Sequence, residues 1–388
     1  FKIGAPNIVM GTAETLYSTV ESAGSFTINI PLYHHTQVRM MIGNADLVIL
    51  LSPEKETNVA INLSNPPGKQ FVFSGQYATI NNEWCQPELI TKIPPVYSDG
   101  DLLDSIVGIS ANEFKKRCIN QYKRYVTHNN AQLQFSEDTR TLANLSCAFD
   151  CLENLQATHY CLQTAYQKKE NITREQAFAA FLDVYLPDDF HNYLKDFPVN
   201  HPLALYCYNY RNVVMDLYDT HKDPLAYEKN LLKNAPLTKE EQTLIHQYET
   251  AFKAGVSFQQ ESELMALSAK YFKENDLFRW ESFSKTKERL SNIIQDSTSL
   301  IVDYIRAIYM RSSFYNLQPL TPRQELMASE ITNPIFLGII QDMNRQMQPR
   351  QKTITKKFTI CEVPQVPEKE LLTALIARHK GKVQFIDF

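Results

Sequence analysis

The sequence has few glycines, no C-x-x-C cysteine pair and no long hydrophobic run. Apolar stretches such as Leu47–Leu51 are far shorter than the roughly 20 residues of a transmembrane helix, so no transmembrane segment is predicted. The seven cysteines have no spacing typical of a zinc site. The net charge is −4, and the lack of a basic surplus argues against a dedicated nucleic-acid-binding protein.

Motifs of familiar catalytic sites are also absent. The sequence contains no G-x-S-x-G, H-E-x-x-H, phosphate-binding loop or G-x-G-x-x-G. We therefore predict no cofactor and no metal site. No signal peptide is visible, but the chain begins with Phe1 rather than Met. We expect that it has been trimmed, which leaves open an attachment to the cell envelope through a removed N-terminal segment.

Glycine and charge divide the sequence into two regions. Seven of the 11 glycines lie in the first 100 residues, which carry only 13 of the 82 charged side chains. Glycine is costly inside helices and useful in turns between strands. The sequence therefore predicts an α+β multidomain protein, with a β domain followed by a helical domain.

The first 76 residues are predicted to contain about seven short strands. Phe26, Ile28 and Ile30 alternate with polar residues, and this period of two is typical of a half-buried strand. The predicted strands are Lys2–Ile8, Thr15–Val20, Phe26–Leu32, Val38–Ile42, Leu47–Leu51, Val59–Leu63 and Phe71–Ser74. Their close spacing predicts a small antiparallel β sandwich over residues 1–85.

A proline-containing connector over residues 86–109 leads to a predicted helical domain over residues 110–350. Ser110 and Glu113 have the spacing of a capping box, and similar start signals recur at Thr173, Thr238 and Thr321. Two stretches, 137–169 and 281–315, are long enough for long helices. The start signals are irregularly spaced, so we expect an irregular helical domain rather than a repeat protein.

The last residues, 351–388, change character again. A strand over Lys357–Cys361, a helix over Glu368–His379 and a strand over Lys380–Phe388 are predicted. This order is the start of an α/β unit whose sheet is incomplete. We therefore expect the parent protein to continue beyond Phe388.

Several polar residues are candidates for chemistry. Cys147 and Cys151 are four residues apart on one predicted helix face, where they could share a metal or a partner, although burial on an apolar stripe is favoured. His34 and His35 are predicted to form an exposed loop pair, since adjacent residues of a strand point to opposite faces. The run Leu205–Tyr210 suits either a ligand groove or helix packing, and packing is favoured.

The richest combination of histidines and carboxylates lies around a proline-containing loop. His191 and His201 flank this loop, and Asp188, Asp189 and Asp196 are close in sequence. Nothing in the sequence defines their geometry, so a catalytic role is the less favoured interpretation.

The segment Lys380–Phe388, with the sequence KGKVQFIDF, resembles the strand that opens the thioredoxin-like domain of TlpA-like thiol-disulfide oxidoreductases. In that family the strand leads directly into W-A-x-W-C-x-x-C. The N-terminal region also resembles the small β sandwich of many periplasmic members. The matching features are Gly24–Phe26, Leu47–Pro53, and Phe71–Gly75 followed by Asn81–Glu83.

The resemblance covers about the first 85 and the last 30 residues, and Gln384 departs from the pattern. It implies that the chain contains the non-catalytic regions of a periplasmic or envelope oxidoreductase, serving partner binding or positioning. The partner would be a protein or a protein disulfide substrate. Asp387 matches the buried acid that accepts a proton for the second redox cysteine. The chain alone is expected to lack activity, since the C-x-x-C is absent. The alternative is a stand-alone periplasmic binding or scaffold protein without a redox role.

Overall fold

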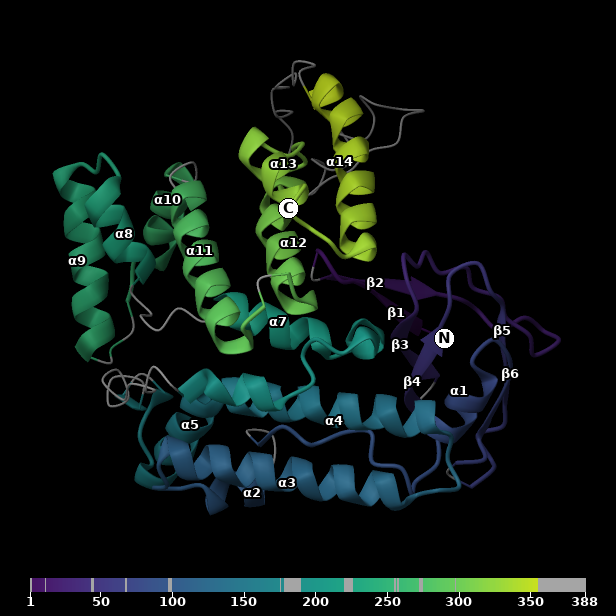
Figure 1. Cartoon of the computed structure of the whole chain (residues 1–388). Helices are drawn as coiled ribbons and strands as arrows, with labels where there is room; N and C mark the ends of the chain where they lie inside the picture. Colours follow the sequence, from purple (N-terminus) through teal and green to yellow (C-terminus); the bar gives the residue numbers. More distant parts are fainter. Residues whose placement is uncertain are drawn as a thin grey trace, which may run out of the picture.

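The computed structural model describes residues 2–354, apart from 11, 43–44, 67, 97–99, 175, 178–189, 220–225, 255, 257, 272–274 and 297. The fold is mixed, with many helices and a small antiparallel sheet at one end. In Figure 1 the strands lie beside the ends of α4 and α14, and the helices form the rest of the molecule. Most of the predicted C-terminal start of a thioredoxin-like domain, residues 355–388, lies outside the described residues.

Four strands form the main sheet, in the order β2-β1-β3-β4. Their bounds are β1 Lys2–Asn7, β2 Thr12–Tyr17, β3 Thr36–Ile42 and β4 Ala45–Leu51. Val38 pairs with Ile49, and Ile3 pairs with Met40, so the apolar members of the alternating pattern share one face. These four side chains are buried together, which confirms the period of two at these strands.

A separate hairpin of β5 (Thr57–Ile61) and β6 (Phe71–Gly75) covers this apolar face. Phe73 of β6 joins the buried cluster of the main sheet. The strand predicted over Phe26–Leu32 is wrong, because this segment belongs to neither sheet. Ile28, Ile30 and Leu32 are half-buried against the cluster, whereas the side chains of Thr27, Asn29 and Pro31 are exposed. The alternation of apolar and polar residues therefore indicates an extended chain that packs on a core. Such a chain need not pair with a neighbouring strand.

Helix α1 (Ala78–Trp84) connects both sheets to the helical region. The amide of Asn81 accepts from Leu50 N (2.7 Å) and donates to Leu50 O (3.0 Å) at the edge of β4. Asn82 bonds both backbone groups of Phe73 on β6 in the same way. Glu83 accepts hydrogen bonds from the backbone and the hydroxyl of Ser136. Side-chain amides thus occupy two strand edges that would otherwise be open.

The rest of the described chain is helical. The helices are α2 Gly100–Ser105, α3 Ala111–Ala131, α4 Glu137–Gln156, α5 Thr158–Glu170, α7 Tyr210–Asp219, α8 Ala226–Asn234, α9 Lys239–Ala254, α10 Glu261–Lys270, α11 Asn275–Ile294, α12 Leu300–Tyr315, α13 Pro322–Ala328 and α14 Pro334–Ile354, with 3₁₀-helices η2 Phe190–Asp196 and η3 Pro202–Tyr206. Ser110 and Thr321 are the N-cap residues of α3 and α13, which confirms both predicted helix starts. The reciprocal capping box forms at Thr321, whereas at Ser110 only the bond from Glu113 N is present. Helix α14 continues past the predicted boundary at residue 350.

The two long helical stretches predicted from the sequence each divide into two helices. Residues 137–169 divide at Ala157 between α4 and α5. Residues 281–315 divide between α11 and α12, where Gln295 has a left-handed φ of 58° and Ser299 is the N-cap residue of α12. A positive φ ends a helix for a non-glycine residue, so the chain turns at this point.

Side chains of α3 and α4 hydrogen-bond to the backbone of the connector. Asn129 bonds both backbone groups of Ile90. Asp150 accepts from Ile93 N (2.7 Å), and Asn154 accepts from Val96 N (2.9 Å) and donates to Pro94 O. These bonds satisfy the backbone of a proline-containing segment that forms no ladder of its own.

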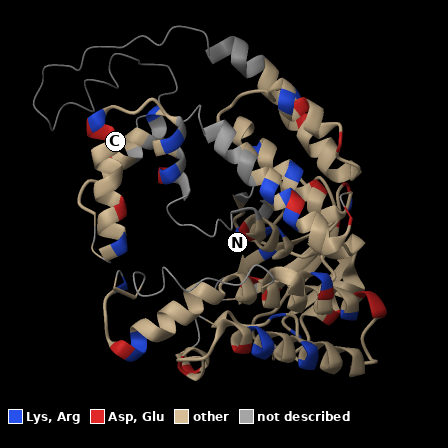
Figure 2. Ribbon diagram, turned by 60° about the vertical axis from the view of Figure 1, so that its left-hand side comes forward, with Lys and Arg blue, Asp and Glu red and all other residues tan. Residues whose placement is uncertain are grey.

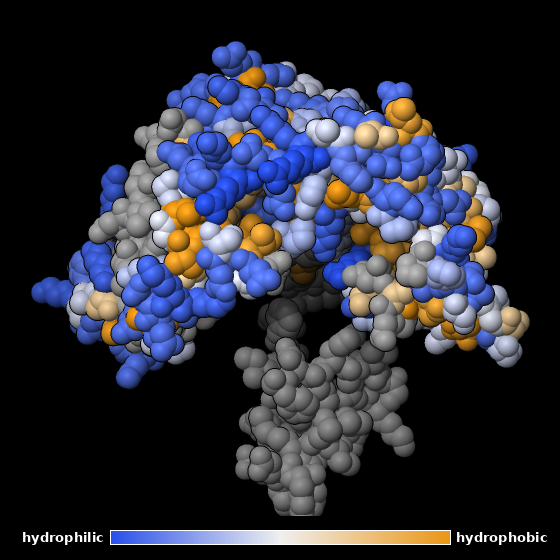
Figure 3. Space-filling view, turned by 90° about the horizontal axis from the view of Figure 1, so that it is seen from below, coloured by the Kyte–Doolittle hydropathy of each residue, from blue (hydrophilic) through white to orange (hydrophobic). Residues whose placement is uncertain are grey.

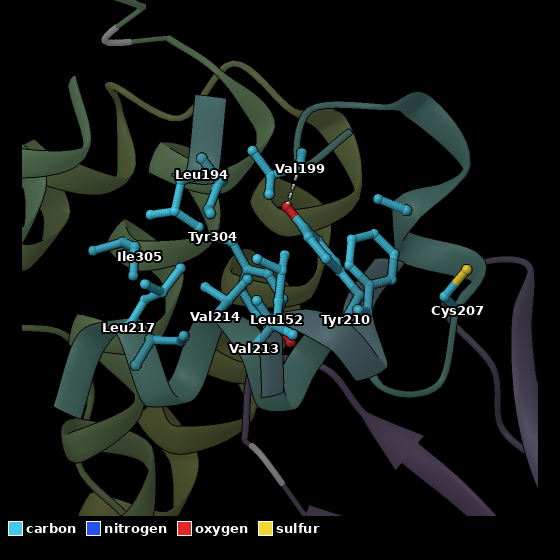
Figure 4. Packing of buried hydrophobic residues seen from close by; sticks show 14 of the residues in the cluster. Leu152, Leu194, Val199, Cys207, Tyr210, Val213, Val214, Leu217, Tyr304 and Ile305 are labelled. Atoms are coloured by element: carbon cyan, nitrogen blue, oxygen red, sulfur yellow. Dashed lines mark hydrogen bonds between the residues drawn. The ribbon is translucent and has the colours of Figure 1, made fainter. Parts of the chain in front are cut away.

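A continuous hydrophobic cluster extends from the strands into the helices. At its centre Tyr210 donates a hydrogen bond to Val199 O (2.8 Å), and its ring lies 4.8 Å from Phe149 and 5.8 Å from Tyr304 (Figure 4). Tyr304 in turn donates to Ile8 O (2.6 Å) in the turn after β1. Residues at the edge of the β region, Ile8, Val9 and Leu50, therefore belong to the helical core, beside the separate cluster between the sheets.

The surface has a mixed character. Basic and acidic residues are interspersed along the helices in Figure 2, and neither sign covers the view shown. On the face in Figure 3, hydrophilic residues predominate and hydrophobic residues form separate small patches. Among the described residues, no helix is both long enough and apolar enough to cross a membrane.

The backbone conformation of Gly75, where the chain leaves β6 toward α1, can be tested by substitution. Its φ is +86°, and a Cβ placed there would lie 2.6 Å from Glu56 O. We expect Gly75→Ala to lower the free energy of unfolding by about 2 kcal/mol or more, because it combines a strained φ with a steric clash. Urea denaturation measures this loss. Gly100→Ala is the matched control, since nothing lies within 4 Å of its Cβ position. Equal stability of the two variants would contradict the prediction.

Candidate functional site

The described thiols are structural groups. Cys118, Cys147, Cys151 and Cys207 are buried and free, Cys161 is buried, and Cys85 is half-buried and free. Cys147 Sγ donates to Ile90 O (3.2 Å) and Cys151 Sγ donates to Cys118 O (3.5 Å). The two cysteines thus bond different carbonyl groups, in agreement with the favoured interpretation of a buried apolar stripe.

Burial controls the protonation of these thiols. Loss of hydration raises the pKa of Cys118 and of Cys147 to about 12, and that of Cys85 to about 11. It also raises the pKa values of Cys151 and Cys207. Because the thiolate is the nucleophile, these groups are poor candidates for disulfide exchange at neutral pH.

The histidine pair does not form the exposed loop that the sequence predicts. His34 is buried, and burial lowers its pKa, so the ring is neutral at neutral pH. His35 lies between two tyrosines, with its Nδ1 2.5 Å from the hydroxyl of Tyr77 and its ring 5.4 Å from that of Tyr206. Packing of the segment before β3 against α1 and η3 buries these rings.

The histidine–carboxylate combination is only partly described. His201 caps η3 by accepting a hydrogen bond from Leu203 N, and buried His191 lies beside Tyr193. Asp188 and Asp189 lie outside the described residues. In the described part of the chain, no three histidine, cysteine, aspartate or glutamate side chains are arranged to hold a metal ion.

The aromatic run Leu205–Tyr210 is used for packing. Tyr210 is in the core, Tyr206 contacts His35, and the backbone of Tyr208 donates to Gln37 of β3. The run therefore connects the sheet to α7, as the packing interpretation expects. Asp387, the acid inferred from the family resemblance, lies outside the described residues together with Cys361.

Two acids on α4, buried Asp150 and half-buried Glu153, were not singled out by the sequence analysis. Asp150 accepts hydrogen bonds from Ile93 N and from the side chain of Asn209. Desolvation nevertheless raises the pKa of Asp150 to about 6, against the opposing effects of these two bonds and of Lys92. A charged residue within the apolar stripe of a predicted helix was the signal that could have identified it.

Glu153 lies one turn further along α4. Desolvation raises its pKa to about 7, and Asp150 and Asp216 add to the shift, whereas Asn212 and Lys92 oppose it. Its Oε1 is buried without a hydrogen-bond partner. Two interacting carboxyls with raised pKa values can hold and exchange a proton near neutral pH. They contact the connector and α7, so they also report on the packing of these elements.

A cavity of about 670 Å³ lies in the β region, lined by the main sheet, the hairpin and the extended segment at residues 24–32. Its apolar wall includes Ile3, Met40, Ile49, Val59 and Phe73. The lining also contains polar side chains and stretches of backbone. A cavity of this size with a mixed lining falls within the range of ligand-binding sites, which is roughly 300–1,000 Å³. This cavity is the candidate binding site.

No family model, no curated protein and no solved structure matches this chain.

Proposed function

We propose that the chain comprises the non-catalytic N-terminal and helical regions of a periplasmic thioredoxin-like thiol-disulfide oxidoreductase. These regions bind a partner protein or position the redox domain on its substrate. In this proposal the main sheet and the hairpin are the two layers of a small β sandwich. The cavity of about 670 Å³ is the observation that carries the binding role, because it combines an apolar wall with polar groups.

The redox part of the proposal is supported by sequence and by thiol chemistry. Lys380–Phe388 resembles the strand before the redox motif, and Asp387 takes the place of the proton acceptor in that resemblance. Burial raises the pKa values of the thiols in the described region, in keeping with the non-catalytic role proposed for it. The periplasmic or envelope location is likewise proposed from the resemblance.

An insulin-reduction assay tests this proposal. In the presence of dithiothreitol, the 388-residue chain is expected to precipitate insulin no faster than a protein-free control, because its described thiols are buried. The product of the complete parent reading frame is expected to accelerate precipitation, through a C-x-x-C encoded shortly after Phe388.

The control for the parent protein is a variant with both cysteines of that motif changed to serine. A parent frame without such a motif, or a parent protein without activity, would contradict the redox proposal. The second candidate function, a stand-alone periplasmic binding or scaffold protein, would then be favoured by the same cavity. Turnover by the 388-residue chain itself would show that one of its seven thiols is reactive.

A further inference from the structure

The extended segment beside the cavity belongs to neither of the two sheets. Residues 26–32 alternate between half-buried and exposed side chains, as a strand does. Ser18 donates a side-chain hydrogen bond to Thr27 O (3.1 Å). Within the described part of the chain, the backbone groups of residues 28–32 have no hydrogen-bond partner. The segment thus has the shape of a strand but lacks a neighbouring strand.

The backbone of this segment borders the cavity. Every residue from 26 to 30 contributes to the lining, although their side chains alternate between half-buried and exposed. On the opposite wall, residues 57–59 of β5 all contribute, and their side chains alternate in the same way. Because consecutive residues of an extended chain cannot all point their side chains one way, main-chain groups border the cavity along both extended stretches.

The second wall includes an open strand edge. Among the described strands, β5 pairs only with β6. The outer edge of β6 is occupied at Phe73 by the amide of Asn82. The outer edge of β5 has no such partner in the described structure, and its residues 57–59 line the cavity. An unpaired edge is a template for an added strand.

We propose that the cavity binds an extended peptide segment of a partner protein, which adds as a β-strand between residues 26–32 and β5. Its main chain bonds to one or both walls, and every second side chain enters the apolar wall formed by Ile28, Ile30, Val59 and Phe73. The inference rests on the proposed partner-binding role and names the chemistry of the partner.

The backbone lining distinguishes a peptide from an apolar ligand. An acyl chain would fill the volume but would bury main-chain groups without partners, and each such group is costly. A peptide strand covers the same apolar wall and satisfies these groups. The apolar wall also predicts which peptides bind best. Every second side chain of the peptide faces this wall, so these side chains should be uncharged and apolar.

A phage-displayed library of random heptapeptides, selected on the full 388-residue chain, tests the proposal. We expect enrichment of sequences with apolar residues at alternate positions. The best synthetic heptapeptide is expected to slow amide hydrogen exchange of residues 26–32 and 57–59 by about tenfold or more, because new hydrogen bonds protect these amides. Dodecanoate serves as the acyl-chain probe in the same exchange experiment.

Two matched variants locate the site. Val59 is half-buried on the inner face of β5, whereas Val72 of β6 is 59% exposed. Val59→Thr keeps the side-chain shape and is expected to weaken peptide binding about fivefold, because a hydroxyl enters an apolar wall. Val72→Thr should leave binding unchanged. Thermal denaturation checks that both variants fold.

The outcomes separate this inference from the proposed function. No enrichment, or peptide binding without protection of residues 26–32 and 57–59, overturns the strand-addition site. If dodecanoate binds and displaces every selected peptide without protecting these amides, the cavity is an acyl-chain pocket. That result also overturns the strand-addition site. Protection by the peptide, with loss in Val59→Thr alone, supports it. If the parent frame then lacks a C-x-x-C, the redox proposal fails while the peptide site stands.

Discussion

Asp303→Ala is expected to lower the free energy of unfolding by about 3–5 kcal/mol, the size of loss seen when a buried ion pair loses one partner. Asp303 is fully buried in α12 and accepts from Arg306 Nη1 at 2.7 Å. It also accepts from the backbone and hydroxyl of Thr332 and from Asn333 N, at the start of α14. Its removal leaves Arg306 with Glu330 as its remaining ion-pair partner, and it leaves the backbone N–H groups of Thr332 and Asn333, just before α14, without this acceptor.

Urea denaturation measures the loss, with Asp104→Ala as the matched control. Asp104 forms an ion pair of similar length with Lys168 (2.6 Å), but both side chains are more than half exposed. Such a surface pair contributes about 0–1 kcal/mol. The double variant Asp303→Leu/Arg306→Met should recover part of the stability, because it leaves no buried charge. Similar losses for Asp303→Ala and Asp104→Ala would refute the assigned role of the network.

The second large effect is a pH dependence of stability. Burial raises the pKa of Asp150 to about 6 and that of Glu153 to about 7, above their ordinary values in an unfolded chain. The folded state therefore holds these protons more tightly than the unfolded state. Their contribution favours folding fully below about pH 4 and is lost as the pH rises to about 7, by an amount on the order of 2–3 kcal/mol for each group.

Glu153→Gln isolates this effect, since the amide stays neutral at every pH. Compared with the wild-type chain, the variant should gain relative stability between pH 5 and pH 8, as measured by the urea midpoint at each pH. The exposed Glu113, which pairs with Arg117, provides the control variant Glu113→Gln. Parallel pH profiles for the wild-type chain and Glu153→Gln would show that Glu153 is already ionised in the folded protein at pH 5.

Local interactions explain which parts of the fold were predictable. Ser110 bonds Glu113 N, and Thr321 and Gln324 form a reciprocal capping box, so both helix starts depend on residues only three positions apart. The inward positions of Val38, Met40 and Ile49 likewise follow from an alternation visible in the sequence, whereas their pairing across the sheet does not. The resemblance of Lys380–Phe388 to a thioredoxin strand stays a prediction.

The candidate site was harder to predict from the sequence, because the segments that line the cavity are distant from one another in the chain. Residues 26–32 have the pattern of a strand, but whether a strand ladder forms depends on which backbone edge lies alongside. The cavity arises from the separation between this segment, the main sheet and β5. No periodicity in the sequence encodes that separation.

The sequence by itself determined the division into a strand region and a helical region, several helix starts and the inward face of most strands. These features depend on residue spacing and on contacts within a few positions. Only the tertiary structure decided that Asn81 closes the edge of β4, that Asp303 binds the segment before α14 and that Asp150 holds the connector. Each of these polar side chains is buried, and a buried polar group requires a partner that long-range packing alone can bring to it.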